Sequence, residues 1–216
     1  MEKEIVQVLN ILGKKYPSHT MTTLNRMRDK PDPYKILISC LLSLRARDEN
    51  TEIVTEKLFN VIKTPEELIK LKRENLEKII FSSGHYHKKA EALFSVSNEL
   101  INRFNSKVPD NYNDLISIKH IGPKTANIVL AFAYGQKVIP VDVHCHRIPN
   151  RIGWINTPNP EKTEIELKKI IPKKYWGEFN AVFVQFGREI CQPVSPKCSI
   201  CPVKDYCNRV GIKKSR

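Results

Sequence analysis

Apolar residues recur at the three- and four-residue spacing of an α-helix along almost the whole chain, and this pattern constrains the fold more than any other feature. The first segment shows it clearly, since Ile5, Val8, Leu9 and Leu12 fall on one helical face. We find no alternating run typical of a strand and no Asn-Gly hairpin signal. The sequence therefore predicts an all-α fold.

Local signals set the ends of several helices. Thr64, Pro65 and Glu67 supply a cap residue, a proline at the first helical position and a capping-box glutamate, so a helix should begin there. After Gly122, residues 126–133 are apolar nearly all round, and we expect this helix to be buried. Further helices are expected over residues 4–15, 36–44, 48–62, a segment ending near 81, 88–104, 110–118, 143–152, 161–171 and 178–190.

Charge points to an anionic partner. The 216 residues include 36 Lys and Arg against 23 Asp and Glu, a formal net charge of +13 that is spread over the chain rather than placed in a tail. A surface of this kind is typical of proteins that follow a phosphate backbone, so nucleic acid is the leading partner. A general lysine bias of the source proteome is the alternative.

The chain shows no membrane or export signal. No apolar run approaches the roughly 18 residues that span a bilayer, and the N-terminal residues lack a basic segment followed by an apolar core. We expect a cytoplasmic protein that does not bind membranes and is nucleoid-associated if the source is prokaryotic.

Four of the six cysteines stand close together near the end of the chain, at Cys191, Cys198, Cys201 and Cys207. Prolines among them indicate a loop rather than a packed apolar face. Inside the cell, four thiolates so spaced bind metal rather than form disulfides. Tetrahedral zinc and a four-iron cluster both accept four thiolates, and the spacing alone leaves both open.

Residues 118–126 form a tight turn between two predicted helices, with Pro123 just inside the second. Backbone N–H groups at such a helix start attract phosphate. Lys124 lies in the first turn, where burial and the positive end of the helix dipole disfavour an ammonium. A neutral amine there is a nucleophile able to form a Schiff base. The alternative is a lysine without a catalytic role that extends to solvent or contacts a phosphate.

Asp142 immediately precedes the predicted helix over residues 143–152, which makes it an expected N-cap. If its second oxygen faces Lys124, it could also act as a base and as the anionic partner of a developing cation. His144 and His146 are two residues apart and do not share a helical face, so we interpret them as structural or DNA-facing rather than as a metal pair. Cys40 and Cys145 sit within apolar helical patterns and are expected to be structural.

The hairpin with Lys124, the run Val141-Asp142-Val143-His144, the run Gln185-Phe186-Gly187 and the cysteine spacing together resemble endonuclease III, in the helix-hairpin-helix superfamily of DNA glycosylases. The resemblance covers essentially the whole chain. It implies that the metal is a [4Fe-4S] cluster bound by the four cysteines.

The same resemblance implies a helix-hairpin-helix DNA glycosylase fold of two helical domains. Residues 26–136 would form a six-helix barrel, with the helix-hairpin-helix motif at about 107–136. Residues 1–25 and 137–216 would form the second domain, which carries the iron–sulfur cluster loop at 191–207. DNA would lie across the groove between the two domains.

By this resemblance, Lys124 attacks the sugar C1′ of a damaged nucleotide rotated out of the duplex, and Asp142 helps to deprotonate the lysine and stabilises positive charge on the sugar. The implied function is a base-excision-repair glycosylase with AP lyase activity. It would act as a monomer on oxidised pyrimidines or abasic sites in double-stranded DNA. A uracil or thymine mismatch glycosylase and a non-catalytic iron–sulfur DNA-binding protein are the alternatives. Relatives specific for mispaired adenine or thymine generally lack this lysine, so its presence favours the lyase.

Some positions depart from the family pattern. His120 stands where the hairpin commonly has glycine, Arg45 and Arg47 lie where many relatives place a gap-filling glutamine, and His85 occupies the usual position of an apolar wedge. Arginine and histidine can both stack on or hydrogen-bond with an orphaned base. The expected DNA contacts are Arg45, Arg47, His85, Lys119, His120, Ile121, Gly122 and Lys197.

Overall fold

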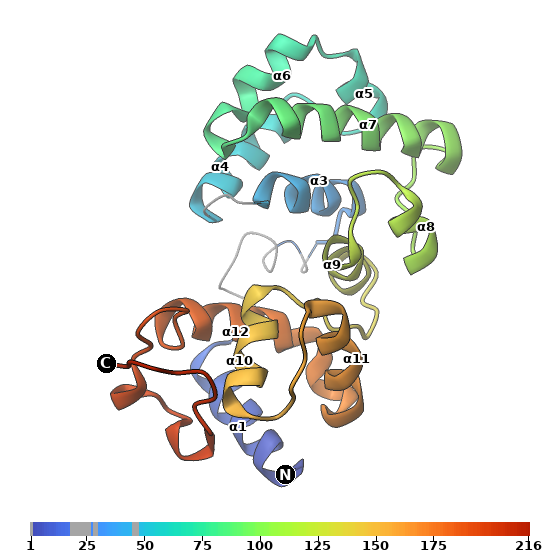
Figure 1. Ribbon diagram of the computed structural model, residues 1–216. Helices are drawn as coiled ribbons and strands as arrows, with labels where there is room; N and C mark the ends of the chain where they lie inside the picture. The colour runs from blue at the N-terminus through green and yellow to red at the C-terminus, as the bar shows by residue number, and fades with distance from the viewer. Residues whose placement is uncertain (1, 18–26, 28–29, 45–47) are drawn as a thin grey trace. The chain divides into compact units, whose positions relative to one another are not determined.

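The computed structural model describes residues 2–17, 27, 30–44 and 48–216 (Figure 1). Over these residues it contains α-helices and short 3-10 helices and no strand, which confirms the predicted all-helical fold. None of the helices described is long and apolar enough to cross a membrane. The backbone forms two compact units: a central unit, Thr22–Gly135, and a terminal unit, Met1–Met21 with Gln136–Arg216. The finer assignment of a six-helix barrel to residues 26–136 stays a prediction.

The central unit is built around helices that are buried on nearly every side. Its helices are α3 (Pro33–Ser43), α4 (Asp48–Phe59), α5 (Pro65–Lys70), α6 (Arg73–Ile80), α7 (Tyr86–Phe104), α8 (Tyr112–Ser117) and α9 (Pro123–Ala133). Helix α3 packs against α4, α7 and α9, while the long α7 also packs against α5 and α6 (Figure 1). Every residue of α9 from Thr125 to Phe132 is buried, which confirms the predicted burial for residues 126–132, while Ala133 at the end of the helix is half-buried.

The ends of these helices follow local chemistry. The Thr64 hydroxyl accepts a hydrogen bond from the Glu67 N–H at 3.3 Å, and Glu67 in turn accepts one from the Lys63 N–H, so the predicted start of α5 is confirmed. Helix α7 begins at Tyr86 rather than near residue 88. The two residues before it, Gly84 and His85, have φ of 69° and 48° and so separate α7 from the preceding turn.

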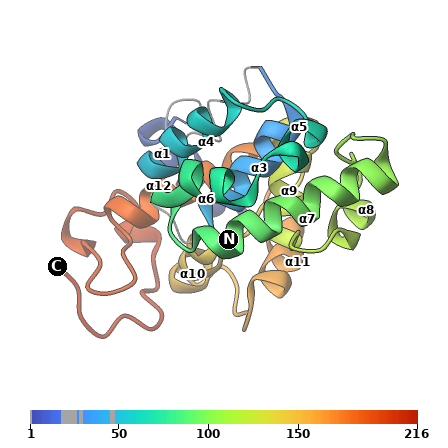
Figure 2. The same cartoon turned by 90° about the horizontal axis from the view of Figure 1, so that it is seen from above.

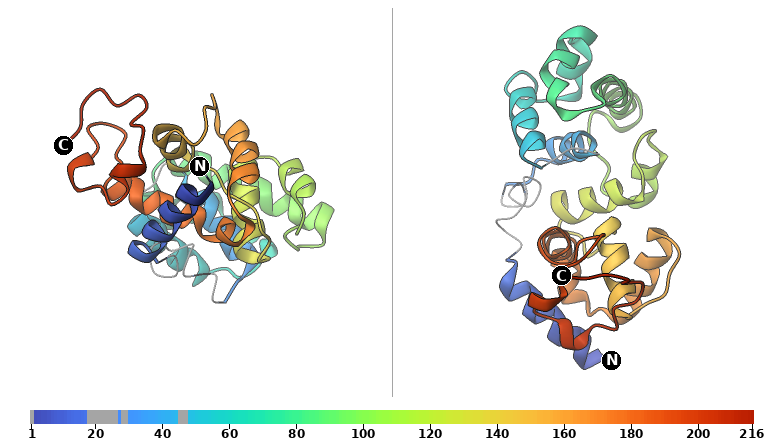
Figure 3. Two further views of the ribbon diagram at one scale, coloured as in Figure 1. Left: turned by 90° about the horizontal axis from the view of Figure 1, so that it is seen from below. Right: turned by 60° about the vertical axis from the view of Figure 1, so that its left-hand side comes forward.

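The terminal unit joins the two ends of the chain. Its helices are α1 (Glu2–Lys15), α10 (Val143–Ile152), α11 (Pro160–Ile170) and α12 (Trp176–Glu189). The apolar face predicted for residues 5–12 is buried against α12, beside which α1 lies (Figure 3). The Phe179 and Phe183 rings stack at 4.0 Å within this core.

The C-terminal loop packs on the end of α10 (Figure 2). The Asn208 N–H donates to the Ile152 carbonyl at 3.0 Å, and the Val210 N–H donates to the Arg151 carbonyl at 2.9 Å. These bonds use the last carbonyl groups of the helix, which have no partner within it. The cysteine loop is therefore attached to the helix whose other end carries Asp142.

Candidate active site and cluster loop

The predicted hairpin is present between α8 and α9. Helix α8 ends at Ser117, the Ile121 N–H donates to the Ile118 carbonyl at 3.1 Å, and α9 starts with Pro123 at its first position. His120 is exposed at the turn with φ of 73°, a left-handed conformation that glycine adopts most easily. The histidine therefore adopts at this turn the left-handed conformation that glycine commonly supplies.

Helix α7 fixes the position of the hairpin. The Lys119 N–H donates to Glu99 Oε1 at 3.0 Å. Arg103 donates to Glu99 Oε2 at 2.6 Å and to the Ser117 hydroxyl at 2.8 Å, and so connects α7 to α8. The Lys119 side chain is exposed, so it is free to meet a phosphate although its N–H is used. Ile121 is 5% exposed and anchors the turn in the core.

The first turn of α9 faces outward. Gly122 is the N-cap and has no side chain to accept hydrogen bonds from the first N–H groups of the helix. Gly122, Pro123 and Lys124 are exposed, and burial begins at Thr125. The expected burial of Lys124 is therefore wrong: the apolar pattern buries α9 from its second turn onward but does not extend to its start.

Lys124 lies near the C-terminal part of α3. Burial raises the pKa of the Cys40 thiol to about 12, and the positive charge of Lys124 opposes this rise. Cys40 is 2% exposed and lies in the last turn of α3, against which α9 packs. The candidate nucleophile is thus placed over the end of a buried helix.

Asp142 caps α10, as predicted. Its Oδ1 accepts hydrogen bonds from the N–H groups of His144 and Cys145, both at 2.9 Å. Both bonds use the same oxygen, so the half-buried carboxylate keeps Oδ2 for another partner. Asp142 belongs to the terminal unit and Lys124 to the central unit.

The glycine of the run Gln185-Phe186-Gly187 allows a close contact between α12 and α10. A Cβ at Gly187 would lie 2.2 Å from His144 Nδ1 and 3.0 Å from His144 Cγ, so the histidine ring packs directly on the backbone of α12. Arg147 Nη2 lies 3.1 Å from the same Nδ1. His146 Nδ1 instead pairs with the Thr163 hydroxyl at 2.7 Å, so the two histidines have separate protein partners.

The four cysteines fit a four-iron cluster. Burial raises the pKa of Cys201 to about 11, and nearby Cys191, Cys207 and Cys198 raise it further, which places the four thiols in one neighbourhood. Among the described residues, no group of three or more His, Cys, Asp or Glu side chains is arranged so that it could bind a single metal ion. In a four-iron cluster each thiolate binds a different iron, so the ligands need not converge on one point.

Two donors face the sulfur atoms. Arg151 Nη1 donates to Cys191 Sγ at 3.4 Å, and the Arg209 N–H donates to Cys207 Sγ at 3.4 Å. Arg151 is 8% exposed and also donates to the Gln192 and Pro193 carbonyls. Sequence reasoning missed this arginine. Its signal was its place three residues after Ile148, on the buried face of α10.

The other expected DNA contacts have varied positions. His85 is exposed, and Lys197 is half-buried beside Cys198 with its N–H bonded to the Ile190 carbonyl at 3.0 Å. Arg45 and Arg47 lie outside the described residues.

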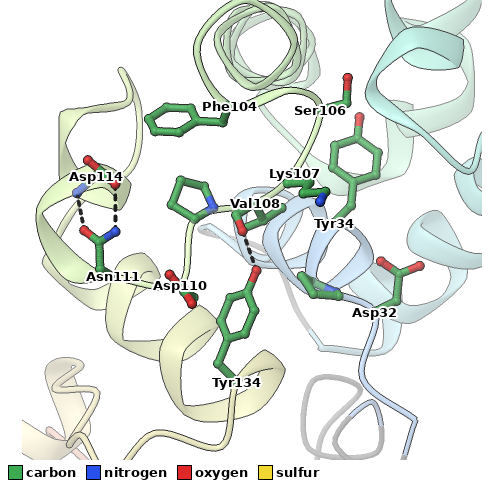
Figure 4. Close-up of a pocket in the computed structure, with 12 residues that line it drawn as sticks. Asp32, Tyr34, Phe104, Ser106, Lys107, Val108, Asp110, Asn111, Asp114 and Tyr134 are labelled. Carbon is green, nitrogen blue, oxygen red and sulfur yellow. Dashed lines mark hydrogen bonds between the residues drawn. The ribbon is translucent and has the colours of Figure 1, made fainter.

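A cavity of about 580 Å³ lies elsewhere in the central unit (Figure 4). Its lining includes Asp32, Asp114 and Asn111, but not Lys124. Asp32 caps α3, and Asn111 caps α8 while donating to Asp114 at 2.7 Å. These polar groups have structural roles, so the cavity is not the candidate active site.

Comparison with known proteins agrees with this geometry. The pattern of the HhH-GPD superfamily of base excision DNA repair proteins matches residues 38–173, and that of the iron-sulfur binding domain of endonuclease III matches residues 191–207. The hairpin and the cluster loop thus define a base excision DNA repair protein of the helix-hairpin-helix class.

Individual relatives narrow the class. Endonuclease III of Thermotoga maritima is 45% identical over 182 residues, which cover 84% of this chain and 85% of that protein. Endonuclease III of Rickettsia conorii is 32% identical over 209 residues, 96% of this chain and 97% of that protein. The chain belongs to the endonuclease III family, and its cofactor is the family's [4Fe-4S] cluster.

Solved structures agree over nearly the full length. A trapped endonuclease III–DNA covalent intermediate and a non-covalent endonuclease III–DNA complex each match with a TM-score of 0.87 and 31% identity, covering 97% of this chain and 96% of the other. A thermostable thymine-DNA glycosylase matches with a TM-score of 0.84 at 24% identity, which shows the fold alone.

Proposed function

We propose that this protein removes oxidised pyrimidines from double-stranded DNA as a base-excision-repair glycosylase and then nicks the strand as an AP lyase through Lys124. The observation that carries the proposal is an exposed lysine in the first turn of α9, directly after a hairpin, in a chain of the endonuclease III family. One chain supplies every group that the reaction needs, so we expect a monomer to be active.

DNA binding would use the start of α9. The N–H groups of its first turn meet no capping side chain and are suited to donate hydrogen bonds to a phosphate. The exposed Lys119 and the net charge of +13 add sequence-independent attraction. A damaged base is extruded at lower cost than a normal one, because its pairing and stacking are already weaker.

The chemistry needs a base as well as an amine. An exposed ammonium cannot attack until it loses a proton, and Asp142 Oδ2 is the acceptor that we assign to it. The Lys124 nitrogen then bonds to C1′ while the glycosidic bond breaks and its electron pair leaves with the base. Asp142 stabilises the cationic sugar that forms.

Strand cleavage follows from the same covalent link. The bound nitrogen gives a proton to the departing base, and its lone pair then forms the Schiff base as the C1′–O4′ bond breaks and O4′ takes up the proton held by Asp142. The Schiff base acidifies the proton on C2′; its removal to a base breaks the bond between C3′ and the phosphate oxygen, and water then hydrolyses the imine and releases Lys124. The cluster supplies a covalent cross-link for residues 191–207 when it is bound. Arg151 orients Cys191 from α10, and Asp142 caps the other end of that helix.

Duplexes carrying one oxidised pyrimidine, a G·U pair, a G·T pair or no lesion test the proposal. We expect base release and nicking at the oxidised pyrimidine, lost in Lys124→Ala while DNA binding persists. Lys119→Ala is the matched control: it should keep the chemistry and weaken binding, with a salt slope lower by about one.

Release of only uracil or thymine would establish the mismatch alternative. Binding without any base release, weakened broadly by Lys124→Ala, would establish a non-catalytic DNA-binding protein.

A further inference from the structure

We propose that the cavity of the central unit (Figure 4) is a binding site for a linear alkyl diamine. Each ammonium group pairs with a carboxylate at one side of the cavity, and the methylene chain between them packs on aromatic rings. The site is separate from the DNA chemistry, so it goes beyond the proposed function and does not depend on it.

The cavity has the size of a small-molecule site. Its volume is about 580 Å³, within the range of roughly 300–1,000 Å³ that such sites occupy. Its lining comes from the start of α3, from the segment 104–114 and from Tyr134, which follows α9. Three parts of the central unit therefore meet around one space.

The cavity lies away from the candidate nucleophile. Lys124 is in the first turn of α9, whereas Tyr134 caps its C-terminal end, ten residues later. A rise of about 1.5 Å per residue places their backbones roughly 15 Å apart. In the same way, Tyr34 lies in the first turn of α3, while Cys40, on which the charge of Lys124 acts, lies in its last turn. A ligand in the cavity is therefore not the nucleotide that Lys124 attacks.

Carboxylates lie at two sides of the cavity. In Figure 4, Asp114 is on one side of the lining and Asp32 on the other, with Val108 and Tyr134 between them. Asp32 uses Oδ1 to cap α3, and Asp114 uses Oδ2 to accept a hydrogen bond from Asn111 at 2.7 Å. Each of these exposed carboxylates keeps its second oxygen for a ligand. Two separated carboxylates suit a molecule with a cation at each end.

Negative charge predominates around the cavity. Among its described lining residues, three aspartates stand against one basic residue, Lys107. Burial raises the pKa of Tyr34, and the charge of Asp32 adds to that rise. Burial raises the pKa of Tyr134 as well, with a further contribution from Asp110. In a chain of net charge +13, this local negative surplus selects a cation.

Aromatic rings supply much of the apolar lining. Phe104 and Tyr134 are half-buried. Tyr34 is 6% exposed, and its hydroxyl forms a hydrogen bond with the Ser97 hydroxyl at 2.8 Å. The Arg103 guanidinium carbon lies 4.9 Å from the centre of the Phe104 ring, so this ring already attracts one cation. Aromatic rings attract ammonium groups and also pack against methylene groups, and a diamine offers both.

The wall that follows α7 is formed without a ligand. Asn105 and Ser106 have φ of 50° and 62°, and the Ser106 N–H donates to the Leu100 carbonyl at 2.9 Å. The Tyr134 hydroxyl donates to the Val108 carbonyl and holds the next part of the wall. A preformed cavity loses less conformational entropy when its ligand binds.

Isothermal titration calorimetry of the cluster-loaded protein without DNA tests the site. The probes are 1,4-diaminobutane, 1,6-diaminohexane and 1,8-diaminooctane, with hexylamine and 1,6-hexanediol as analogues that lack one or both charges. We expect one equivalent of a diamine to bind saturably, hexylamine to bind at least about tenfold more weakly, and hexanediol not to bind. No saturable binding of any diamine, or hexylamine that binds as tightly as every diamine, would overturn the site.

Two charge variants test the carboxylates. Asp32→Asn and Asp114→Asn each remove a charge but keep an oxygen for the existing hydrogen bond, and asparagine is a good N-cap. Each should bind diamines about tenfold more weakly and lose the preference over hexylamine. Glu91→Gln is the matched control, since it removes one charge from an exposed position of α7, 13 residues before Phe104. Diamine affinities equal to that of Glu91→Gln in both asparagine variants would refute the assignment.

Two further variants test the ring and the sign of the charge. Phe104→Leu keeps an apolar side chain but removes the ring, so diamine affinity should fall about two- to fivefold. Lys107→Met removes the basic residue of the lining and should strengthen diamine binding. Weaker binding in Lys107→Met would contradict a cationic ligand. If Phe104→Leu does not fold, as judged by circular dichroism, the two asparagine variants decide.

A lysine-bearing peptide is the other source of the same chemistry. The peptide acetyl-Lys-Gly-Lys-amide should bind more weakly than the best diamine, and tighter binding of the peptide would overturn the diamine as the occupant. Because these titrations contain no DNA, they separate the two proposals. A protein that nicks the lesion but binds no diamine contradicts this site alone, and one that binds the diamine but nicks no lesion contradicts the proposed function alone.

Discussion

Replacing Gly187 by alanine tests whether the contact between α10 and α12 has the tight packing described above. The new Cβ would lie 2.2 Å from His144 Nδ1, 3.0 Å from His144 Cγ and 3.1 Å from Ile148 Cδ1. Rotating the ring about χ2 cannot relieve the contact with Cγ, because Cγ lies on the rotation axis. The His144 side chain must therefore leave its rotamer and lose its contact with Arg147.

The magnitude combines two effects. Overpacking of this kind costs about 1–3 kcal/mol, while alanine gains ~1 kcal/mol over glycine inside a helix. We expect a net loss of up to roughly 2 kcal/mol in the free energy of unfolding, or a Tm lower by up to about 8 °C for a chain of this size. Because the His144 N–H bonds to Asp142, the nicking rate should fall as well.

Gly13→Ala is the matched control, since Gly13 is also inside a helix and a Cβ there would meet nothing within 4 Å. It should raise stability by about 0.5–1 kcal/mol. Thermal unfolding of the cluster-loaded protein, followed by circular dichroism, measures both variants. A Gly187→Ala protein as stable as Gly13→Ala would refute the packing argument.

Other perturbations give distinct results. Arg151→Met removes the donor to Cys191 Sγ, so the brown absorbance should disappear about 10–100-fold faster in the presence of a chelator; an unchanged rate would contradict this role. Because burial lowers the pKa of Lys89 to about 8, the lysine is more often protonated in the unfolded chain than in the folded protein between pH 8 and 10. Its contribution to the free energy of unfolding therefore rises with pH in that window, by at most ~3 kcal/mol. Urea unfolding at pH 7.5 and 9.5 should show this rise in the free energy of unfolding in Lys88→Met and not in Lys89→Met. An equal rise in both variants would exclude Lys89 as its source. Thr64→Ala should cost about 1 kcal/mol through loss of the α5 cap, and no change in the urea midpoint would show that the cap is dispensable.

Local chemistry made much of the structure predictable from the sequence. The caps at Thr64 and Asp142 and the proline start of α9 depend on neighbours within three residues, so the sequence contains the information directly. The apolar face of α1 was equally readable, because a period of three to four residues defines it without knowledge of its partner.

Features that depend on distant segments were not predicted. Lys89 shares a helical face with the buried Leu93, Val96 and Leu100, and its own burial was not predicted. Its carbonyl partners, however, come from a helix 47 residues away and from the turn before α7. The burial of Lys124 was predicted wrongly because periodicity does not show where a buried helix emerges from the core.

Covalent capture at a single amine tests the central claim most directly. Wild-type protein is incubated with a duplex containing an oxidised pyrimidine, reduced with borohydride and digested, and the peptide joined to the nucleotide is sequenced by mass spectrometry. The account predicts one adduct, on Lys124, and none when Lys124→Ala is treated in the same way. An adduct on another residue, or one that persists in Lys124→Ala, would contradict it.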